Sequence, residues 1–161
     1  MKTLLIYASK YSSTKTCADH IAAALPGTTD VQPAESAPSP QGYDRVVLGT
    51  AIYGGTSLPA MQSYCKKYSK ELLQQPLHLF ICCINPKSAV INKQIQTAFT
   101  PALYQHATQA VNFGGAIDIN QLTIAEKAMM RLLGHTDSKS TINYEAISQF
   151  SDAVSHTGTS D

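Results

Sequence analysis

Runs of apolar, β-prone residues alternate with helix patterns along the chain, and this alternation constrains the fold more than any other feature of the sequence. We predict five strands, at Thr3–Ala8, Thr29–Gln32, Arg45–Ala51, Leu77–Ile84 and Ala110–Ala116. We predict five helices, at Ser13–Leu25, Ser57–Leu73, Ser88–His106, Leu122–Leu133 and Tyr144–Ser155. The first, third and fourth strands are almost continuously apolar, which indicates strands covered on both faces. The sequence therefore predicts an α/β fold, a three-layer, doubly wound sandwich with a five-stranded parallel sheet.

Length and composition fit one domain. The chain has 161 residues and is 43% apolar, which is enough for a core that needs no disulfide or metal support. We predict a single domain over residues 1–156 and a flexible C-terminal tail over residues 157–161. The connection Pro33–Gly42 contains three prolines and cannot hold a long helix, so we expect an irregular crossover there. A linker between two domains is the alternative, but too few residues precede it to make a domain.

The charge balance excludes several classes of partner. Twelve basic and eleven acidic residues give a net charge of +1, so we expect no nucleic-acid partner. No apolar run has the length needed to span a bilayer, and the N-terminal segment lacks the pattern of a signal peptide. We therefore predict a cytoplasmic protein whose four cysteines remain reduced. Cys17 and His20 lie one helical turn apart, but the other histidines are scattered, and we predict no metal site.

Three turns are expected at the carboxyl edge of the sheet, which is where open α/β sheets bind their ligands. They cover residues 9–14, 50–57 and 83–89. The first turn is rich in hydroxyls and opens a helix, whose free N–H groups and partial positive charge favour an anion. An ordinary helix start with one capping hydroxyl is the simpler alternative, but this cluster exceeds what a cap needs. The first turn therefore predicts a phosphate site.

The second and third turns are suited to a planar ring. Tyr53 ends a buried strand, where its aromatic face can stack on a ring, and Gly54-Gly55 lets the backbone approach closely. In the third turn, Ile84 and backbone groups would line the ring, and Lys87 would be the nearest formal charge. Each turn alone is consistent with an ordinary turn. Beside an anion site at the same edge, they indicate a mononucleotide.

Several motifs resemble those of a known family. The segment Ser9–Thr14 reads Ser-Lys-Tyr-Ser-Ser-Thr and is similar to the flavodoxin phosphate loop, T/S-x-T-G-x-T. The stretch Gly49–Gly55 is similar to the flavodoxin loop that carries one face of the flavin. Asp44–Tyr53 and Phe113–Ala116 resemble the flavodoxin-domain proteins related to quinone-dependent protoporphyrinogen IX dehydrogenase. The resemblance runs from Met1 to about residue 154, and it implies a flavodoxin-like fold with sheet order 2-1-3-4-5 and bound FMN.

The resemblance implies that the three turns hold FMN. The expected cofactor contacts are Ser9, Lys10, Tyr11, Ser12, Ser13, Thr14, Thr50, Ala51, Ile52, Tyr53, Gly54, Gly55, Cys83, Ile84, Asn85 and Lys87. Ser12 departs from the family pattern, which has glycine at that position. If the position requires a positive φ, the serine costs about 1 kcal/mol and weakens FMN binding.

The turns expected to face the ring contain no Asp or Glu, so we expect no carboxylate beside the flavin. Acidic flavodoxins that act as electron shuttles differ in this respect. The neutral turns favour an FMN-dependent oxidoreductase with a small substrate, such as a porphyrinogen or a quinone. The alternatives are an electron-transfer protein that serves a protein redox partner, and a cofactor-free binding module. No residue stands out as a general acid or base, so we predict no catalytic side chain.

The predicted helix Leu122–Leu133 has an apolar stripe, with Glu126, Lys127 and Arg131 on the opposite side. We expect the stripe to pack on the sheet, as in most amphipathic helices of globular proteins. A contact with a membrane or with a substrate is the alternative that the resemblance suggests, and the residues themselves do not indicate it.

Overall fold

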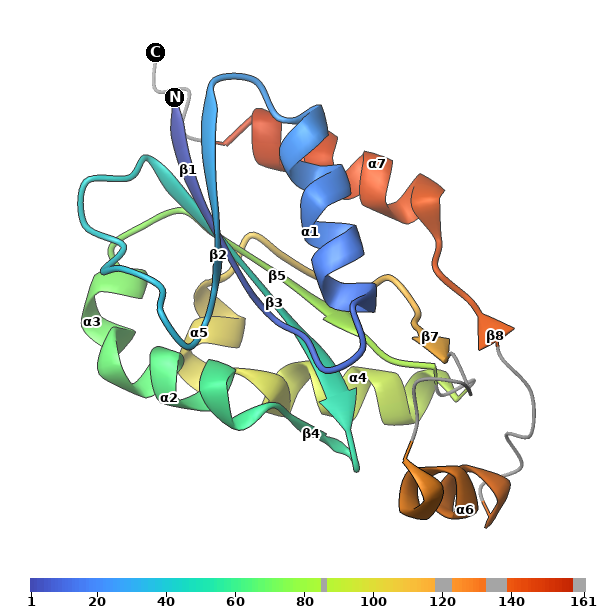
Figure 1. Cartoon of the computed structure of the whole chain (residues 1–161). Coiled ribbons are helices and arrows are strands. Elements are labelled where there is room, and N and C mark those ends of the chain that lie inside the picture. The colour runs from blue at the N-terminus through green and yellow to red at the C-terminus, as the bar shows by residue number, and fades with distance from the viewer. Residues whose placement is uncertain (85–86, 118–122, 133–138, 158–161) are drawn as a thin grey trace.

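A parallel sheet forms the middle layer of the fold. The computed structural model describes residues 1–84, 87–117, 123–132 and 139–157, and Figure 1 shows the sheet between two layers of helices. The parallel strands are β1 (Lys2–Ala8), β2 (Thr28–Pro33), β3 (Arg45–Tyr53), β5 (Leu77–Cys82) and β6 (Gln109–Asn112). They lie in the order β2-β1-β3-β5-β6. This is the order 2-1-3-4-5 of the parallel strands, so the predicted fold and sheet order are confirmed.

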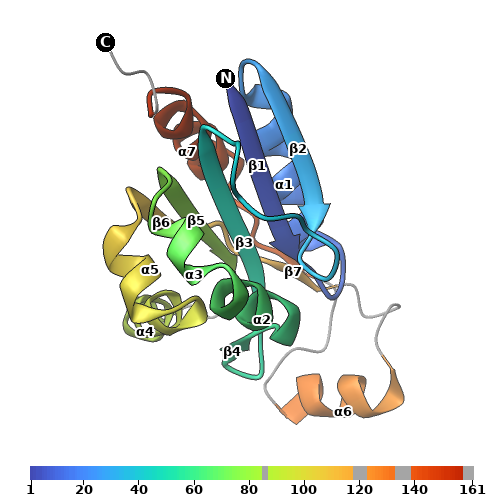
Figure 2. The same ribbon diagram turned by 90° about the vertical axis from the view of Figure 1, so that its left-hand side faces the viewer.

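Helices cover both faces of the sheet. The described helices are α1 (Ser13–Ala24), α2 (Pro59–Lys67), α3 (Ser69–Leu72), α4 (Ser88–Ala98), α5 (Pro101–His106), α6 (Ile124–Leu132) and α7 (Tyr144–Ser155). Helices α1 and α7 cover one face, and α2 to α5 cover the other (Figures 1 and 2). Successive side chains of a strand point to opposite faces, so Leu5 packs in the cluster with Ile21 and Phe150 while Leu4 joins Met61. Both faces are therefore apolar.

Three short strands lie outside this parallel order. Strand β4 (Thr56–Ser57) pairs antiparallel with the end of β3 and forms a hairpin with it. Strands β7 (Ala116–Ile117) and β8 (Lys139–Ser140) form a separate antiparallel pair. The β3–β4 hairpin matters for function because it carries the second of the three predicted turns.

The predicted helix Ser88–His106 is divided into α4 and α5 at Pro101. Proline lacks the N–H that an α-helix needs and disfavours helical backbone in the residue before it. Thr100 is accordingly extended, with φ −151° and ψ 157°. Its Oγ1 accepts a hydrogen bond from the Leu103 N–H at 3.1 Å and so caps α5.

The other differences from the predicted elements are shifted ends and two further divisions, that of the predicted helix Ser57–Leu73 at Tyr68 into α2 and α3 and that of the predicted strand Ala110–Ala116. The predicted helix Ser57–Leu73 begins instead with the end of β4, and α2 starts at Pro59, which suits the first helical position. Strand β5 ends two residues before the predicted end at Ile84. The predicted strand Ala110–Ala116 is divided between β6 and β7, because the chain turns at Gly114, whose φ is 79°.

Helix α6 stands apart from the three layers (Figure 2). Met129 and Leu132 of the predicted stripe are 47% and 90% exposed, so the prediction that its apolar stripe packs on the sheet is wrong. Polar contacts of Glu126 attach the helix to the turns instead. The predicted helix ends at Leu122 and Leu133 lie outside the described residues. None of the described helices is long and apolar enough to cross a membrane.

The predicted C-terminal tail begins in contact with the core. Thr157 Oγ1 lies 2.8 Å from His78 Nε2, and the Thr157 carbonyl accepts a hydrogen bond from the Arg45 guanidinium at 3.2 Å. Residues 158–161 lie outside the described part of the chain.

Candidate functional site

The turn after β1 holds Ser12 in the left-handed region, with φ 72° and ψ −13°. Among the residues that the structure describes, Ser12 is the one non-glycine residue with a positive φ. The position therefore favours glycine, as the family pattern implied, and a serine there costs about 1 kcal/mol. This backbone turn starts α1, since the Thr16 N–H donates to the Ser12 carbonyl at 2.9 Å.

Hydroxyl groups without partners lie in the same turn. Ser9 Oγ and Tyr11 OH are buried and have no hydrogen-bond partner in the described part of the protein. Thr14 Oγ1 is also buried without such a partner, and its hydroxyl lies beside the Cys82 thiol. A buried, unpaired hydroxyl costs about 1–3 kcal/mol, so the group in this turn indicates a site that a ligand or water completes. They lie at the N-terminus of α1, which favours an anionic ligand.

Replacing Ser12 with glycine is expected to raise the free energy of unfolding by about 0.5–1 kcal/mol, because glycine adopts a positive φ without steric strain. Chemical denaturation of the protein without ligand measures this change. Ser13→Gly is the matched control: Ser13 is the first helical residue, and its replacement should lower stability. If Ser12→Gly lowers the free energy of unfolding as much as Ser13→Gly or more, then Ser12 is not strained.

The second turn is a tight β-hairpin at the end of β3. The strand continues past its predicted end at Ala51, so Thr50, Ala51, Ile52 and Tyr53 are its last four residues. Gly54 and Gly55 form the turn with φ values of 61° and 81°, the two positive values that a type I′ hairpin requires. Tyr53 therefore has a fixed place beside the first turn.

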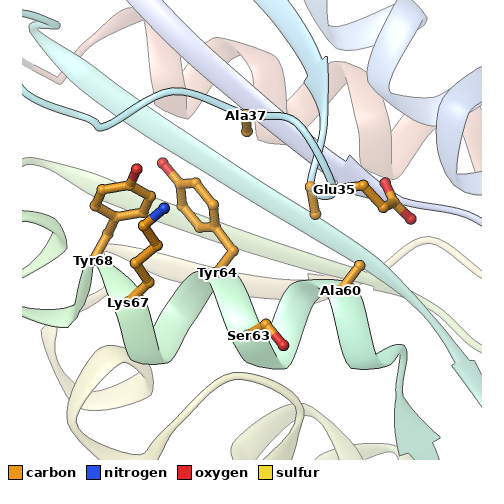
Figure 3. A pocket seen from close by; sticks show the side chains of 8 residues that line it. Glu35, Ala37, Ala60, Ser63, Tyr64, Lys67 and Tyr68 are labelled. Atoms are coloured by element: carbon orange, nitrogen blue, oxygen red, sulfur yellow. The ribbon is translucent and has the colours of Figure 1, made fainter.

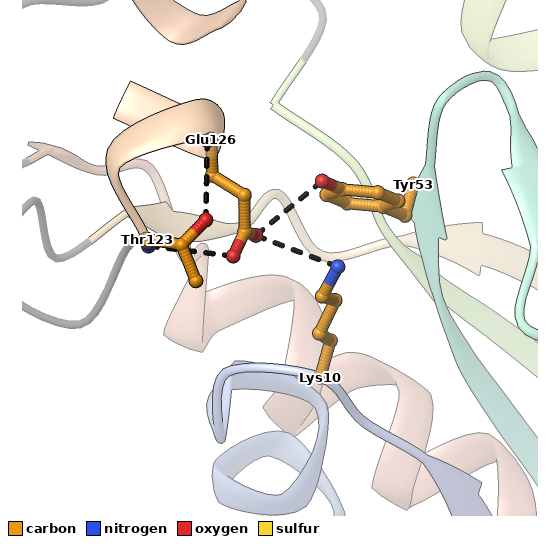
Figure 4. A network of polar contacts seen from close by, with 4 residues as sticks. All are labelled: Lys10, Tyr53, Thr123 and Glu126. Carbon is orange, nitrogen blue, oxygen red and sulfur yellow. Dashed lines mark hydrogen bonds and ion pairs between the residues drawn. The ribbon is translucent and has the colours of Figure 1, made fainter. Parts of the chain in front are cut away.

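Tyr53 takes part in a polar network that links three distant segments (Figure 4). Lys10 Nζ lies 3.6 Å from the centroid of the Tyr53 ring. Glu126 of α6 forms an ion pair with Lys10 at 3.4 Å and accepts a hydrogen bond from the Tyr53 hydroxyl at 3.3 Å. Thr123 and Glu126 form a capping box, with the Glu126 N–H donating to Thr123 Oγ1 at 3.2 Å and the Thr123 N–H donating to Glu126 Oε1 at 3.4 Å.

The third turn is held by the asparagine that ends the last parallel strand. Asn112 Oδ1 accepts hydrogen bonds from the Cys83 and Gly114 N–H groups, both at 3.0 Å, and Asn112 Nδ2 donates to the Cys83 carbonyl at 3.2 Å. Ile84 packs closely against Gly115. The predicted contact Lys87 is exposed at the start of α4, and Asn85 lies outside the described residues.

Two site residues were missed from the sequence. Asn112 lies at the carboxyl end of β6, so the argument that predicted the three turns applies to it as well. Glu126 contradicts the expectation that no carboxylate lies near the ring-facing turns. Its capping box with Thr123 is a visible helix-start pattern, but that pattern does not show where the helix docks.

Two hollows lie outside the phosphate turn. One of about 430 Å³ lies between Gly55 of the hairpin and α4. The other, about 340 Å³, lies between the segment after β2 and helix α2 (Figure 3). Tyr64 and Tyr68 line it, with Glu35 and Lys67. Neither lining includes the buried hydroxyls without partners in the turn after β1.

Several solved structures are similar to this chain in fold. A structure of a short-chain flavodoxin associated with a non-canonical PDU bacterial microcompartment has a TM-score of 0.64 at 10% identity, and covers 99% of both chains. A flavodoxin, WrbA-like protein of Agrobacterium tumefaciens has a TM-score of 0.58 at 14% identity, covering 98% of this chain and 94% of its own. A flavoprotein of Lactobacillus acidophilus NCFM, solved with FMN, has a TM-score of 0.55 at 10% identity, covering 69% of this chain and 92% of its own. At these identities the likeness shows the fold.

The sequence comparison identifies the family. Comparison with curated proteins gives no match. A family model described as the flavodoxin domain matches residues 4–143, which is most of the chain and includes all three turns. The chain therefore belongs to the flavodoxin-domain family.

Proposed function

We propose that this protein binds FMN at the carboxyl edge of its sheet and transfers electrons through the bound flavin. The observation that carries the proposal is the pair of buried hydroxyls without partners, Ser9 Oγ and Tyr11 OH, at the N-terminus of α1. Such a cradle suits a phosphate. Membership of the flavodoxin-domain family supports the same cofactor. When bound, a flavin supplies one- and two-electron chemistry, and the protein supplies its position and surroundings.

Each of the three turns would contact a different part of the cofactor. The turn after β1 would bind the phosphate, because its free hydroxyls and the α1 N-terminus are directed there. Tyr53 would offer an aromatic face to the ring, and its place is fixed by the Gly54-Gly55 hairpin. The third turn would line the ring with Ile84 and backbone groups, held in place by Asn112.

Within this function we propose an oxidoreductase with an apolar substrate of its own, such as a porphyrinogen or a quinone. Helix α6 exposes Ile124, Met129 and Leu132, and Glu126 attaches the same helix to Tyr53. An apolar surface next to the ring suits a hydrophobic substrate better than it suits docking through an acidic patch. A cytoplasmic location and a small-molecule redox partner belong to the same proposal.

Anaerobic turnover separates this proposal from an electron shuttle. The purified protein should show a flavin absorbance spectrum, which a cofactor-free binding module would lack. The flavin should then be reduced by protoporphyrinogen and reoxidised by menaquinone. Reduction only by a protein electron donor would support the shuttle instead.

The phosphate cradle itself is tested by Tyr11→Phe. Loss of a hydrogen bond to a charged group should weaken FMN binding about tenfold to a hundredfold. The affinity for riboflavin, which has no phosphate, should not change. Removing a buried, unpaired hydroxyl should leave the stability of the free protein unchanged or raise it by about 1 kcal/mol. Flavin fluorescence titration and chemical denaturation measure the two effects.

Tyr43→Phe is the matched control for this experiment. The Tyr43 hydroxyl already donates to Asp30 Oδ2 at 2.7 Å, outside the three turns. Its removal should lower stability and leave FMN binding unchanged. The phosphate assignment is wrong if Tyr11→Phe weakens FMN and riboflavin equally.

A further inference from the structure

An ammonium group already lies on one face of the tyrosine that is expected to stack on the flavin. Lys10 Nζ is 3.6 Å from the centroid of the Tyr53 ring, which is a close cation–π contact. Lys10 comes from the turn after β1, and Tyr53 comes from the hairpin after β3. Any planar ligand that stacks on this face must take the place of the Lys10 ammonium.

Glu126 holds Lys10 in this position. Its carboxylate oxygen Oε2 contacts both Lys10 Nζ, at 3.4 Å, and the Tyr53 hydroxyl, at 3.3 Å. The side chain of Glu126 is only 15% exposed, whereas that of Lys10 is 36% exposed. The carboxylate is thus the more buried partner, and the Thr123 N–H also donates to its Oε1.

The charge of Lys10 persists at neutral pH. Desolvation acts to lower the pKa of the Lys10 ammonium. The Tyr53 hydroxyl and the Glu126 carboxylate outweigh this effect and raise the pKa above its ordinary value. The ammonium therefore leaves the Tyr53 face by displacement rather than by losing its proton.

We propose that Lys10, held by Glu126, is the resident occupant of the Tyr53 ring face, and that flavin binding displaces it. This inference rests on the proposed binding of FMN. The Lys10–Glu126 ion pair would then set how much of the site is open to the ring of a flavin. The measured affinity equals the intrinsic affinity multiplied by the fraction of molecules in which the face is open.

The displaced ammonium has a second role in the same proposal. Lys10 belongs to the turn with the unpaired hydroxyls, so after displacement its positive charge stays in the segment that would bind the phosphate. Lys10 would thus weaken the binding of the flavin ring and strengthen the binding of the phosphate. This makes the site selective for FMN over riboflavin. Only FMN has a phosphate that can attract the displaced Lys10 ammonium and so offset the free energy lost when the ammonium leaves Tyr53.

Two variants separate these roles. Glu126→Gln keeps a side chain of the same shape, with an oxygen that can accept from Tyr53, and removes the charge that holds Lys10. It should tighten the binding of FMN and riboflavin by the same factor, roughly three- to tenfold. Lys10→Met removes the ammonium from both places. It should tighten riboflavin binding but lower the ratio of FMN affinity to riboflavin affinity about tenfold.

Ionic strength supplies a second readout that does not depend on activity. Riboflavin is uncharged, so salt acts on its binding mainly through the ion pair of the protein. In the natural sequence the affinity for riboflavin should rise with salt, and in Glu126→Gln it should not depend on salt. Asp19→Asn is the matched control, because Asp19 forms an exposed ion pair with Lys15 at 2.8 Å and makes no contact with Tyr53. It should leave the affinity and its salt dependence unchanged.

The outcomes distinguish this inference from the proposed function. Flavin binding that Glu126→Gln leaves unchanged or weakens overturns the role of the ion pair and leaves the FMN site standing. A lack of flavin binding by the natural sequence and by every variant overturns the FMN site and this inference with it. Binding by Glu126→Gln that exceeds binding by the natural sequence supports both. Thermal unfolding of each variant confirms that it is folded before the titrations are compared.

Discussion

Replacing Gly49 with alanine is expected to lower the free energy of unfolding by about 3 kcal/mol, because an aromatic ring occupies the space of the new methyl group. A Cβ atom on Gly49 would lie 1.9 Å from Cζ of Phe80, its partner on the neighbouring strand β5. Phe80 is fully buried, and its ring centroid lies 5.0 Å from that of Phe113 and 5.9 Å from that of Phe150. The ring cannot move away without disturbing this cluster.

A double-mutant cycle identifies the cause of this loss. Phe80→Leu alone should also destabilise the protein, since it leaves a cavity among aromatic rings. Combined with Gly49→Ala, it should cost less than the sum of the two single changes, with a coupling of about 1–2 kcal/mol. Chemical denaturation measures all four proteins. A loss of less than about 1 kcal/mol for Gly49→Ala, or strict additivity, would contradict the steric argument.

The features that could be predicted from the sequence depend on local patterns. The alternation of strands and helices predicts the doubly wound parallel sheet, and the resemblance to the flavodoxin phosphate loop implies its strand order. The position of Ser12 could be predicted in the same way, because the family pattern has glycine there and the structure shows a φ of 72°. The break at Pro101 was also visible in the sequence, and the predicted helix ran through it because the apolar periodicity continues on both sides.

The placement of α6 could not be predicted in this way. Its apolar stripe has the same period as that of a helix that packs on a sheet, yet Met129 and Leu132 of this stripe are exposed. The contact that positions the helix is the ion pair between Lys10 and Glu126, which are far apart in the sequence. No local pattern encodes such a pairing. The carboxylate beside Tyr53 could not be predicted for the same reason, because Glu126 lies outside the three turns in the sequence.

Acidification from pH 7 to pH 5 is expected to lower the free energy of unfolding by about 2 kcal/mol through His78 alone. His78 is buried on β5, and desolvation together with the nearby positive charge of Arg45 lowers its pKa to about 4. Its hydrogen bonds require the neutral ring. Gln109 Nε2, an amide nitrogen that can only donate, lies 3.0 Å from His78 Nδ1 and also donates to the Phe150 carbonyl, so His78 Nδ1 accepts a hydrogen bond. His78 Nε2–H donates to Thr157 Oγ1 at 2.8 Å.

The sign of this effect follows from which state binds the proton. In the unfolded chain the imidazole titrates at its ordinary value of about 6.5, whereas in the folded protein it stays neutral until about pH 4. Between these values the unfolded state binds more protons, so stability falls as the pH falls through this range. A protonated Nδ1 would also face the Gln109 amide as a second donor, which adds to the penalty.

Chemical denaturation at several values between pH 7 and pH 5 measures the loss. His78→Gln removes the titrating group and should flatten the dependence by about 2 kcal/mol, even if the variant is less stable at pH 7. Replacement of the exposed His20 is the control for losing an imidazole outside the core, so a flattening found only in His78→Gln assigns the slope to the buried ring. A slope that persists in His78→Gln would show that other groups carry the acid sensitivity. NMR titration of His78 then decides the point independently, since a folded-state pKa near 6.5 removes the basis of the prediction.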